Sequence, residues 1–257
     1  MKTRDRAVPI NSRIVLYLTL LSGAMLATNS ASAQQPETTA SIYLWVTNVN
    51  EKLTNGAEVD IDNSTMLDNL DFAFEGNLEH RRGNWLYGFD VVYADVGKSE
   101  NLDVPIDGGS VTADTDVNSS TTVLSGYAGY RLVKNRNWEL YGTGGLRYAN
   151  FDTTLKTDAD DAGVSYRLDI EEDPTDVIVG LRGAYTIDQN WAFPFLVDVG
   201  GGGSDLTWQA YGAVSYSWGP NTVSGGYRYM NWQLDSDSKY LDEVTYEGPL
   251  LAYSFHF

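Results

Sequence analysis

The segment Trp208-Gln209-Ala210-Tyr211-Gly212-Ala213-Val214-Ser215-Tyr216-Ser217-Trp218 alternates between two kinds of residue. Every second residue from Trp208 to Trp218 is apolar, aromatic or glycine, and Gln209, Ser215 and Ser217 lie between them. Successive side chains of a β-strand point to opposite faces, so this period of two predicts a strand with one apolar face.

Eight other segments repeat the alternation: residues 70–81, 85–94, 124–132, 138–148, 177–185, 191–199, 223–229 and 249–257. A tenth segment, residues 42–46, is apolar on both faces, so its phase stays open. The pattern therefore predicts an all-β chain of about ten strands. Eight or twelve strands remain alternatives, because element boundaries are the least certain part of such a prediction.

Alternation alone does not say which face points inward. A soluble barrel or sandwich would bury the apolar face, whereas a membrane barrel would turn it toward lipid. In nine of the segments the apolar face carries no Asp, Glu, Lys or Arg between its ends. A Lys or Arg there would cost about 2–4 kcal/mol at the bilayer midplane, so the absence of charge favours the membrane barrel.

The connections between the segments alternate between short and long, which is the rule for outer-membrane barrels. The short ones are residues 82–84, 133–137, 188–190 and 219–221, and we assign them to the periplasm. The long ones are residues 49–69, 96–120 and 152–174, with shorter connections near Gly201 and Asp235. An even number of strands places both termini on the periplasmic side, and a lipid-exposed sheet must close because an open edge leaves backbone groups unpaired.

Aromatic residues recur at the short turns. Trp85, Trp138 and Trp191 each follow an Asn there, at intervals of 53 residues. This spacing places them at one membrane depth, as an interfacial aromatic girdle requires; the alternative is a repeated hairpin that carries Trp incidentally. The full predicted set of lipid-interface aromatics is Trp85, Trp138, Trp191, Trp218 and Phe257.

The first 33 residues have the order of a secretory signal peptide. Lys2, Arg4, Arg6 and Arg13 precede an apolar stretch, and Ala31-Ser32-Ala33 forms an A-x-A cleavage signal. The alternative is an uncleaved membrane anchor. Removal of residues 1–33, which also contain Asp5, leaves 13 of the 17 basic and 34 of the 35 acidic residues in the barrel domain, residues 34–257.

The polar face of the strands carries balanced charge. Its members are Glu75, Glu79, Arg81, Asp90, Arg131, Glu139, Arg147, Arg182, Asp198 and Arg228. All five cations are arginines, whose planar guanidinium binds carboxylates in pairs of hydrogen bonds and tolerates desolvation better than lysine. We interpret the set as a salt-bridge network that lines and largely fills the lumen; the alternative is a narrow charged path for small solutes.

The remaining charge is strongly acidic. The lumen takes five residues of each sign, the short turns take Arg82, Lys134, Arg136 and Asp188, and Glu37 lies near the start of the domain. Five basic and 27 acidic residues are then left for the outer loops. This balance disfavours nucleic acid as a partner. Divalent cations at the acidic loops are a candidate partner, but residues 158–163 lack calcium-loop spacing, so a solvated charged surface is the simpler interpretation.

The sequence does not point to an enzyme. It contains no Cys, and its only histidines are His80 and His256. Both are expected at the periplasmic rim, His80 on the lipid-facing phase. Ser254 shares a face with His256, but nothing marks it as a nucleophile. We expect no catalytic residue, metal site or cofactor.

Several motifs resemble a known family when they are taken together. They are Tyr43-Leu44-Trp45, residues 67–73, residues 200–209, Gly226-Tyr227-Arg228-Tyr229, residues 248–251 and Phe255-His256-Phe257. They resemble a widespread group of uncharacterised Gram-negative outer-membrane β-barrel proteins of similar length. The resemblance implies the barrel fold and an outer-membrane location, but no agreed activity and no site residues.

The resulting prediction is a single closed antiparallel transmembrane β-barrel with short periplasmic turns and long acidic outer loops. Its partners would be outer-membrane lipid and lipopolysaccharide, and the terminal Phe257 resembles an assembly signal for the barrel assembly machinery. Its role would be structural, or limited to passage of small solutes. Surface binding or adhesion through the acidic loops is the alternative, and an outer-membrane hydrolase is the third hypothesis.

Overall fold

The structure is a computed structural model, and it describes residues 37–54, 58–61, 63–106, 109–159, 164–234, 238 and 241–257. The predicted signal peptide, residues 1–33, lies outside these ranges, and its removal stays a prediction. The alternating segments become strands, and one short helix, α1 (Asn63–Asp68), precedes the second barrel strand. Within the described ranges, no helix has the length and apolar composition needed to cross a membrane.

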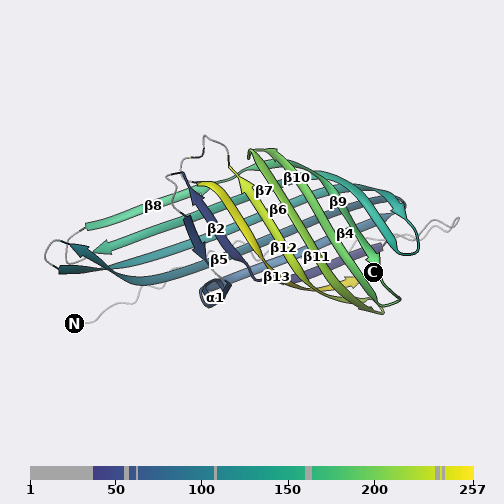
Figure 1. Ribbon diagram of the computed structural model, residues 1–257, viewed down its shortest axis with the longest axis horizontal. Helices are drawn as coiled ribbons and strands as arrows, with labels where there is room; N and C mark the ends of the chain where they lie inside the picture. The colour runs from purple at the N-terminus through teal and green to yellow at the C-terminus, as the bar shows by residue number, and fades with distance from the viewer. Residues whose placement is uncertain are drawn as a thin grey trace, which may run out of the picture. The chain divides into compact units, whose positions relative to one another are not determined.

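Ten strands form a closed antiparallel barrel (Figure 1). In order around the barrel they are β1 (Glu37–Trp45), β4 (Leu70–Arg82), β5 (Trp85–Ile106), β6 (Gly109–Lys134), β7 (Trp138–Ala159), β9 (Thr175–Thr186), β10 (Trp191–Gly202), β11 (Leu206–Trp218), β12 (Asn221–Gln233) and β13 (Leu241–His256). The barrel closes where β1 pairs with β13, from Thr39↔His256 to Trp45↔Leu250. The predicted fold and strand number are confirmed.

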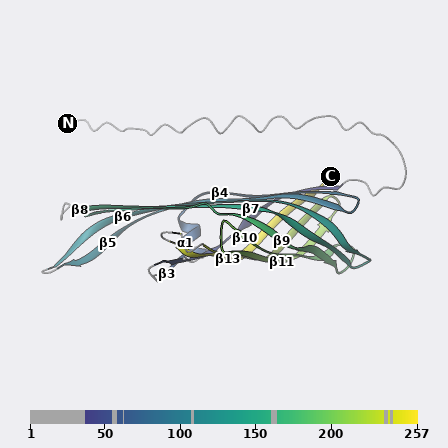
Figure 2. The same cartoon turned by 90° about the horizontal axis from the view of Figure 1, so that it is seen from above.

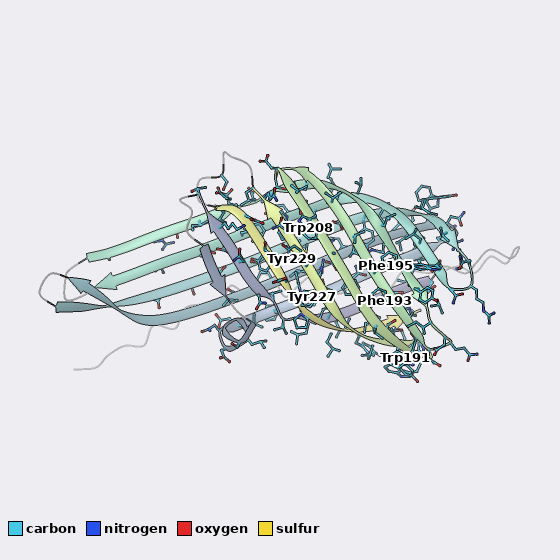
Figure 3. The ribbon with its side chains drawn as sticks, viewed as in Figure 1. Trp191, Phe193, Phe195, Trp208, Tyr227 and Tyr229 are labelled. Carbon is cyan, nitrogen blue, oxygen red and sulfur yellow. The ribbon has the colours of Figure 1, made fainter. Side chains whose placement is uncertain are left out.

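The apolar face points outward, as predicted. Phe89 and Tyr227 are each 48% exposed, whereas Arg147 and Arg228 are 0% and 4% exposed. Figure 3 labels the outward aromatic residues of β10, β11 and β12. The structure also settles the phase of the first strand, since Ile42 is 63% exposed and the neighbouring Tyr43 packs against the buried core.

Two aromatic girdles bound this outward face. At the periplasmic end, Trp85, Trp138 and Trp191 each contact a Tyr of the next strand. The ring centroids of Trp85–Tyr130, Trp138–Tyr185 and Trp191–Tyr216 lie 5.2, 4.9 and 4.9 Å apart. At the outer end, the pairs Phe72–Tyr93 and Trp208–Tyr229 lie 5.9 and 4.5 Å apart. The nine residues from Trp85 to Tyr93 agree with the roughly 9–11 that a tilted transmembrane strand needs.

The other two predicted interface aromatics lie at the periplasmic rim. Trp218 is 44% exposed and its ring lies 6.1 Å from that of Tyr216. Phe257 is 66% exposed, and its backbone N–H donates to the carbonyl of Thr38 at 2.9 Å. The chain end is therefore held to the start of β1 while its ring faces outward.

Two of the periplasmic turns depend on glycine. The β4–β5 hairpin turns at Gly83 and the β11–β12 hairpin at Gly219, with φ angles of 63° and 57°. Side chains other than glycine rarely adopt this left-handed region, so these two positions explain the tightest reversals of the chain.

The other two periplasmic turns share one hydrogen-bond pattern. Asn135 Oδ1 accepts from the backbone N–H groups two and three residues ahead, at 3.0 and 2.9 Å. Asp188 Oδ1 accepts from the equivalent groups at 2.8 Å each. Asn and Asp side chains favour turns because they can hydrogen-bond to the backbone in this way. The third residue ahead is Trp138 or Trp191, which explains why these two girdle residues occupy equivalent positions.

The long outer connections differ from the prediction in their local structure. Residues 96–120 and 152–174 are largely strand, since β5 and β6 stay paired from Val96↔Ser119 to Ile106↔Gly109. A further strand, β8 (Val164–Glu172), pairs with the outer part of β7. A strand with water on both faces needs no apolar face. The two connections therefore show little alternation between apolar and polar residues. Strands β5–β8 form a projection beyond the barrel (Figures 1 and 2).

A smaller addition lies on the opposite part of the outer rim. Strand β2 (Asn48–Leu53) pairs with the outer part of β13, and β3 (Glu58–Ile61) pairs with β2. Pairing of β1 with β4 runs only from Glu37↔Arg81 to Ile42↔Gly76. Beyond that level, the backbone N–H of Trp45 donates to the Glu75 carboxylate at 2.6 Å.

The acidic turn is expected to weaken at low pH, whereas its amide counterpart is not. Backbone N–H groups of Asn190 and Trp191 lower the pKa of Asp188 below its ordinary value. A carboxyl group whose pKa is lowered by folding stabilises the fold above its unfolded pKa, and this contribution is lost as pH falls through the folded value. Between about pH 6 and about pH 3, exchange protection should fall at Asn190 and Trp191 relative to Asn137 and Trp138. Amide hydrogen exchange measured by NMR tests this.

The variant Asp188→Asn provides the matched control, because it gives the second turn the chemistry of Asn135. Both turns should then respond to pH alike. An identical pH response of the two turns in the unmodified protein would contradict the assignment.

Candidate functional site

The outer half of the lumen is closed by an apolar core, which we call the outer plug. Its buried members are Trp45, Val49, Val92, Val123, Ala149, Phe151, Ile170, Met230, Trp232, Leu234, Leu241, Val244, Tyr246 and Leu250. The aromatic members meet across the barrel: the Phe151 ring on β7 lies 5.2 Å from Trp232 on β12 and 6.1 Å from Tyr246 on β13. Strand β7 is adjacent to neither strand, so these contacts fill the lumen, and Trp232 is 0% exposed.

A charged network, the central network, adjoins the plug on its periplasmic side. Arg147 Nη2 donates to Asp198 Oδ1 at 2.7 Å, and the other Asp198 oxygen accepts from Gln209. Gln209 Oε1 in turn accepts from Arg228 Nη2 at 2.9 Å. Arg228 Nη2 also donates to Asp90 Oδ1 at 2.9 Å. Because these residues come from β5, β7, β10, β11 and β12, the network also crosses the lumen.

A second set of charges lies nearer the periplasmic end. Glu79 forms an ion pair with Arg182 across the lumen and another with Arg81, at 2.9 Å, on its own strand. Tyr127 donates to Glu79 Oε1 at 2.9 Å, and the Arg182 guanidinium lies 4.1 Å from the centre of the Tyr127 ring. Gly88 makes room for this ring, since a Cβ there would lie 2.1 Å from Tyr127 Cζ.

The remaining predicted lumen residues divide into two groups. Arg131 and Glu139 pair at the rim at 3.4 Å, and Lys134 joins Glu139 at 3.2 Å. Glu75 is buried, and among the described residues it pairs with no arginine, since its carboxylate accepts from the Trp45 backbone N–H. All ten predicted residues therefore face the lumen or its rim, and nine of them form ion pairs.

Sequence reasoning missed several uncharged members of the networks. Tyr43 accepts from Arg228 Nη1 and donates to Asp90 Oδ2, at 2.9 and 3.0 Å. Gln209 and Tyr127 occupy the polar phase of their strands, and this position was the signal in the sequence that could have identified them.

The sequence analysis also missed one buried carboxylate. Asp176 is 0% exposed and accepts from the Ser204 backbone N–H at 2.8 Å, although its place at a strand end suggested a loop residue.

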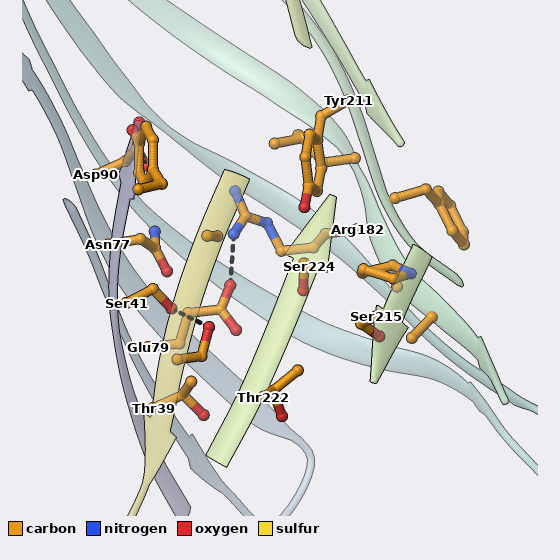
Figure 4. A pocket seen from close by; sticks show the side chains of 18 of the residues that line it. Thr39, Ser41, Asn77, Glu79, Asp90, Arg182, Tyr211, Ser215, Thr222 and Ser224 are labelled. Carbon is orange, nitrogen blue, oxygen red and sulfur yellow. Dashed lines mark hydrogen bonds and ion pairs between the residues drawn. The ribbon is translucent and has the colours of Figure 1, made fainter. Parts of the chain in front are cut away.

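A cavity of about 300 Å³ occupies the periplasmic part of the lumen (Figure 4). One wall consists of small hydroxyl side chains from β1, β11, β12 and β13: Thr39, Ser41, Ser215, Ser217, Thr222, Ser224 and Ser254. The facing wall includes Glu79, Arg81, Glu139 and Arg182. Arg228 and Asp90 lie at its inner end, so the central network separates this cavity from the outer plug.

The two histidines have structural partners. His80 Nδ1 is 2.9 Å from Thr38 Oγ1, on the outward phase of β4. His256 lies at the cavity rim, with Nδ1 2.9 Å from Thr39 Oγ1 and Nε2 2.9 Å from Thr222 Oγ1. Ser254 Oγ is 2.7 Å from Ser41 Oγ rather than beside His256.

Cation capture by the acidic loops, the less favoured interpretation, concerns residues that the structure describes only in part. Residues 160–163 lie outside the described ranges. In the rest, Asp152 and Asp169 are exposed, and Asp169 pairs with Arg167 at 2.8 Å. Among the described residues, no group of three or more acidic or histidine side chains is placed to hold a metal ion.

Several solved structures of outer-membrane barrels resemble this chain at low similarity. The translocator domain of autotransporter NalP from Neisseria meningitidis is 12% identical, with 89% of this chain and 90% of that chain covered and a TM-score of 0.47. Ail, the attachment invasion locus protein of Yersinia pestis, is 15% identical, with 86% and 98% covered and a TM-score of 0.35. Neisserial surface protein A is 10% identical, with 88% and 100% covered and a TM-score of 0.30.

No family model and no curated protein sequence matches the chain. At these identities and TM-scores, no activity of the three proteins transfers to it. The location follows from the molecule itself: a closed β-barrel with a lipid-facing belt between two aromatic girdles is an integral protein of the Gram-negative outer membrane.

The central network is expected to stabilise the folded barrel strongly. Arg228→Met removes the guanidinium and leaves Asp90 as a buried charge without its ionic partner. Loss of one partner of a buried pair typically lowers the free energy of unfolding by about 3–5 kcal/mol. Urea unfolding of the protein in lipid vesicles, followed by heat-modifiable gel migration, measures this change.

Arg167→Met is the matched control, since the Arg167–Asp169 pair lies on the projection with both side chains more than half exposed. Exposed pairs contribute little, so its unfolding midpoint should not change. Equal midpoints for the two variants would show that the central network does not hold the barrel.

Proposed function

We propose that the protein is a non-conducting outer-membrane anchor that presents the projection of β5–β8 at the cell surface. The observation that carries this proposal is the filled outer half of the lumen. A passage role would need a continuous aqueous path, whereas here an apolar layer and a charged layer lie in series.

The apolar layer is the stronger barrier to ions. Trp232, Met230 and Val244 are each 0% exposed, and Phe151 is 3% exposed. An ion crossing this layer would lose its hydration without receiving polar partners, which costs several kcal/mol or more. The hydrogen bond of 2.7 Å between Thr121 on β6 and Tyr246 on β13 further ties opposite walls together.

The projection supports the presenting role. Strands β5, β6, β7 and β8 stay paired well beyond the outer girdle, so they form a sheet rather than separate loops. Asp116, Asp152 and Glu171 are exposed on it. A sheet built on a rigid barrel positions side chains more accurately than loops do, which favours surface binding over a purely structural role.

Small-solute passage is the second candidate, and the periplasmic cavity is the observation that favours it. Planar-bilayer recordings separate the two functions. We expect no discrete conductance steps from the folded protein, with an open porin in the same bilayer as the positive control. Steady ion currents from the folded protein would overturn the non-conducting role and favour passage.

Epitope tags test the presenting role and its orientation. A tag inserted between Ile106 and Gly109, at the tip of the projection, should be labelled by antibody on intact cells. The matched tag at Arg136, in the β6–β7 turn, should be labelled only after the outer membrane is permeabilised. Equal labelling of both tags on intact cells would contradict the proposed orientation.

A further inference from the structure

The cavity at the periplasmic end has features that neither anchoring nor presentation uses. A barrel that only needs rigidity gains from a filled interior, because packed side chains contribute dispersion and burial energy. Here the plug and central network fill the outer part, yet about 300 Å³ stays open beside Ser215, Ser224 and Tyr211. This volume is at the lower end of the range for small-molecule sites.

The charges that line the cavity are already paired. Glu79 is paired with Arg81 and Arg182, and Asp90 with Arg228. Glu139 is paired with Arg131 and Lys134 at the rim. A charged ligand would have to compete with these pairs, so the electrostatics of the cavity favour an uncharged molecule.

The hydroxyl groups of Ser224 and Tyr211, in contrast, are available to hydrogen-bond to a ligand. Ser224 is 7% exposed and lines the cavity, and among the described residues its hydroxyl has no hydrogen-bond partner. The Tyr211 hydroxyl likewise has none within that part of the chain, and it points into the cavity (Figure 4). Both hydroxyls border the cavity, where a bound molecule or water can complete their hydrogen bonds.

The surrounding wall extends this hydrogen-bonding surface. Ser41–Ser254 and Ser217–Thr222 are hydroxyl pairs at 2.7 and 2.8 Å. In each pair one oxygen accepts and the other donates, so each pair offers further lone pairs and a reorientable proton. Groups that both donate and accept match the hydroxyls of a sugar or polyol, and Leu86, Leu196 and Leu250 in the same lining suit its C–H surface.

We propose that this cavity is a periplasm-facing binding site for a small neutral polyhydroxylated molecule, a sugar or polyol of mono- or disaccharide size. The ligand enters from the periplasm because the central network and the outer plug close the other end. This site is separate from the projection, so it is independent of the presenting role.

Binding is tested with the folded barrel in detergent micelles, by NMR titration with glucose and maltose, and with glucose 6-phosphate and glucosamine as charged comparators. We expect saturable shifts at cavity residues with the neutral sugars and weaker binding of both charged comparators. Tyr211→Phe removes only the free hydroxyl and should weaken neutral-sugar binding roughly three- to tenfold. Ser224→Ala should have a similar effect.

Tyr227→Phe is the matched control, because it makes the same substitution on the lipid-facing surface and should leave binding unchanged. Heat-modifiable migration verifies that each variant is folded, and Tyr211→Phe keeps the test decisive if Ser224→Ala does not fold. Absence of saturable shifts with either neutral sugar would overturn the proposal. Equal affinity in Tyr211→Phe and the unmodified protein, or tighter binding of a charged comparator, would also overturn it.

Discussion

Hydrocarbon offers no hydrogen-bond partner to a backbone N–H or C=O group, and this constraint governs the whole molecule. Strands that face lipid must pair on both edges, so ten strands close through β1 and β13. The same constraint turns charged side chains between the two girdles inward, among them Asp90, Arg147 and Arg228. There, carboxylates and guanidiniums meet at close range, as Arg147 and Asp198 do at 2.7 Å. Closure and the internal network are therefore two consequences of one condition.

Burying charge is unfavourable unless each ion is compensated, and the lumen achieves this by shared contacts. Arg228 contacts Asp90, Gln209 and Tyr43, so neutral donors and acceptors satisfy the groups that the ion pair leaves open. Tyr127 has the same role beside Glu79 and Arg182. Its ring lies where Gly88 has no side chain, which links a small residue on β5 to the geometry of an ion pair between β4 and β9. Packing and electrostatics are not separable in such an interior.

Alternation, together with the absence of charge from one face, was sufficient for the barrel strands, the lipid-facing side and the lumen-facing charges, because these depend only on which face a residue occupies. It could not assign partners: Arg228 and Asp90 are 138 positions apart, and whether they meet depends on strand tilt and register. The sequence pattern did not predict the outer plug, for a different reason. Phe151, Trp232 and Tyr246 lie outside the alternating segments at residues 138–148, 223–229 and 249–257, although all three belong to the longer strands β7, β12 and β13. The alternation pattern also did not predict the projection, because strands with water on both faces need no apolar face.

The two ends of the barrel differ because they meet different demands. The outer end borders the environment, and the plug there combines apolar packing with cross-barrel aromatic contacts. The periplasmic end borders a compartment of the cell, and its turns are fixed by side chains such as Asn135 and Asp188 that hydrogen-bond to the backbone. Since those turns hold the rim without help from the interior, small hydroxyl side chains are tolerated behind it. A barrel sealed at one end and rigid at the other can keep an open cavity without becoming a pore.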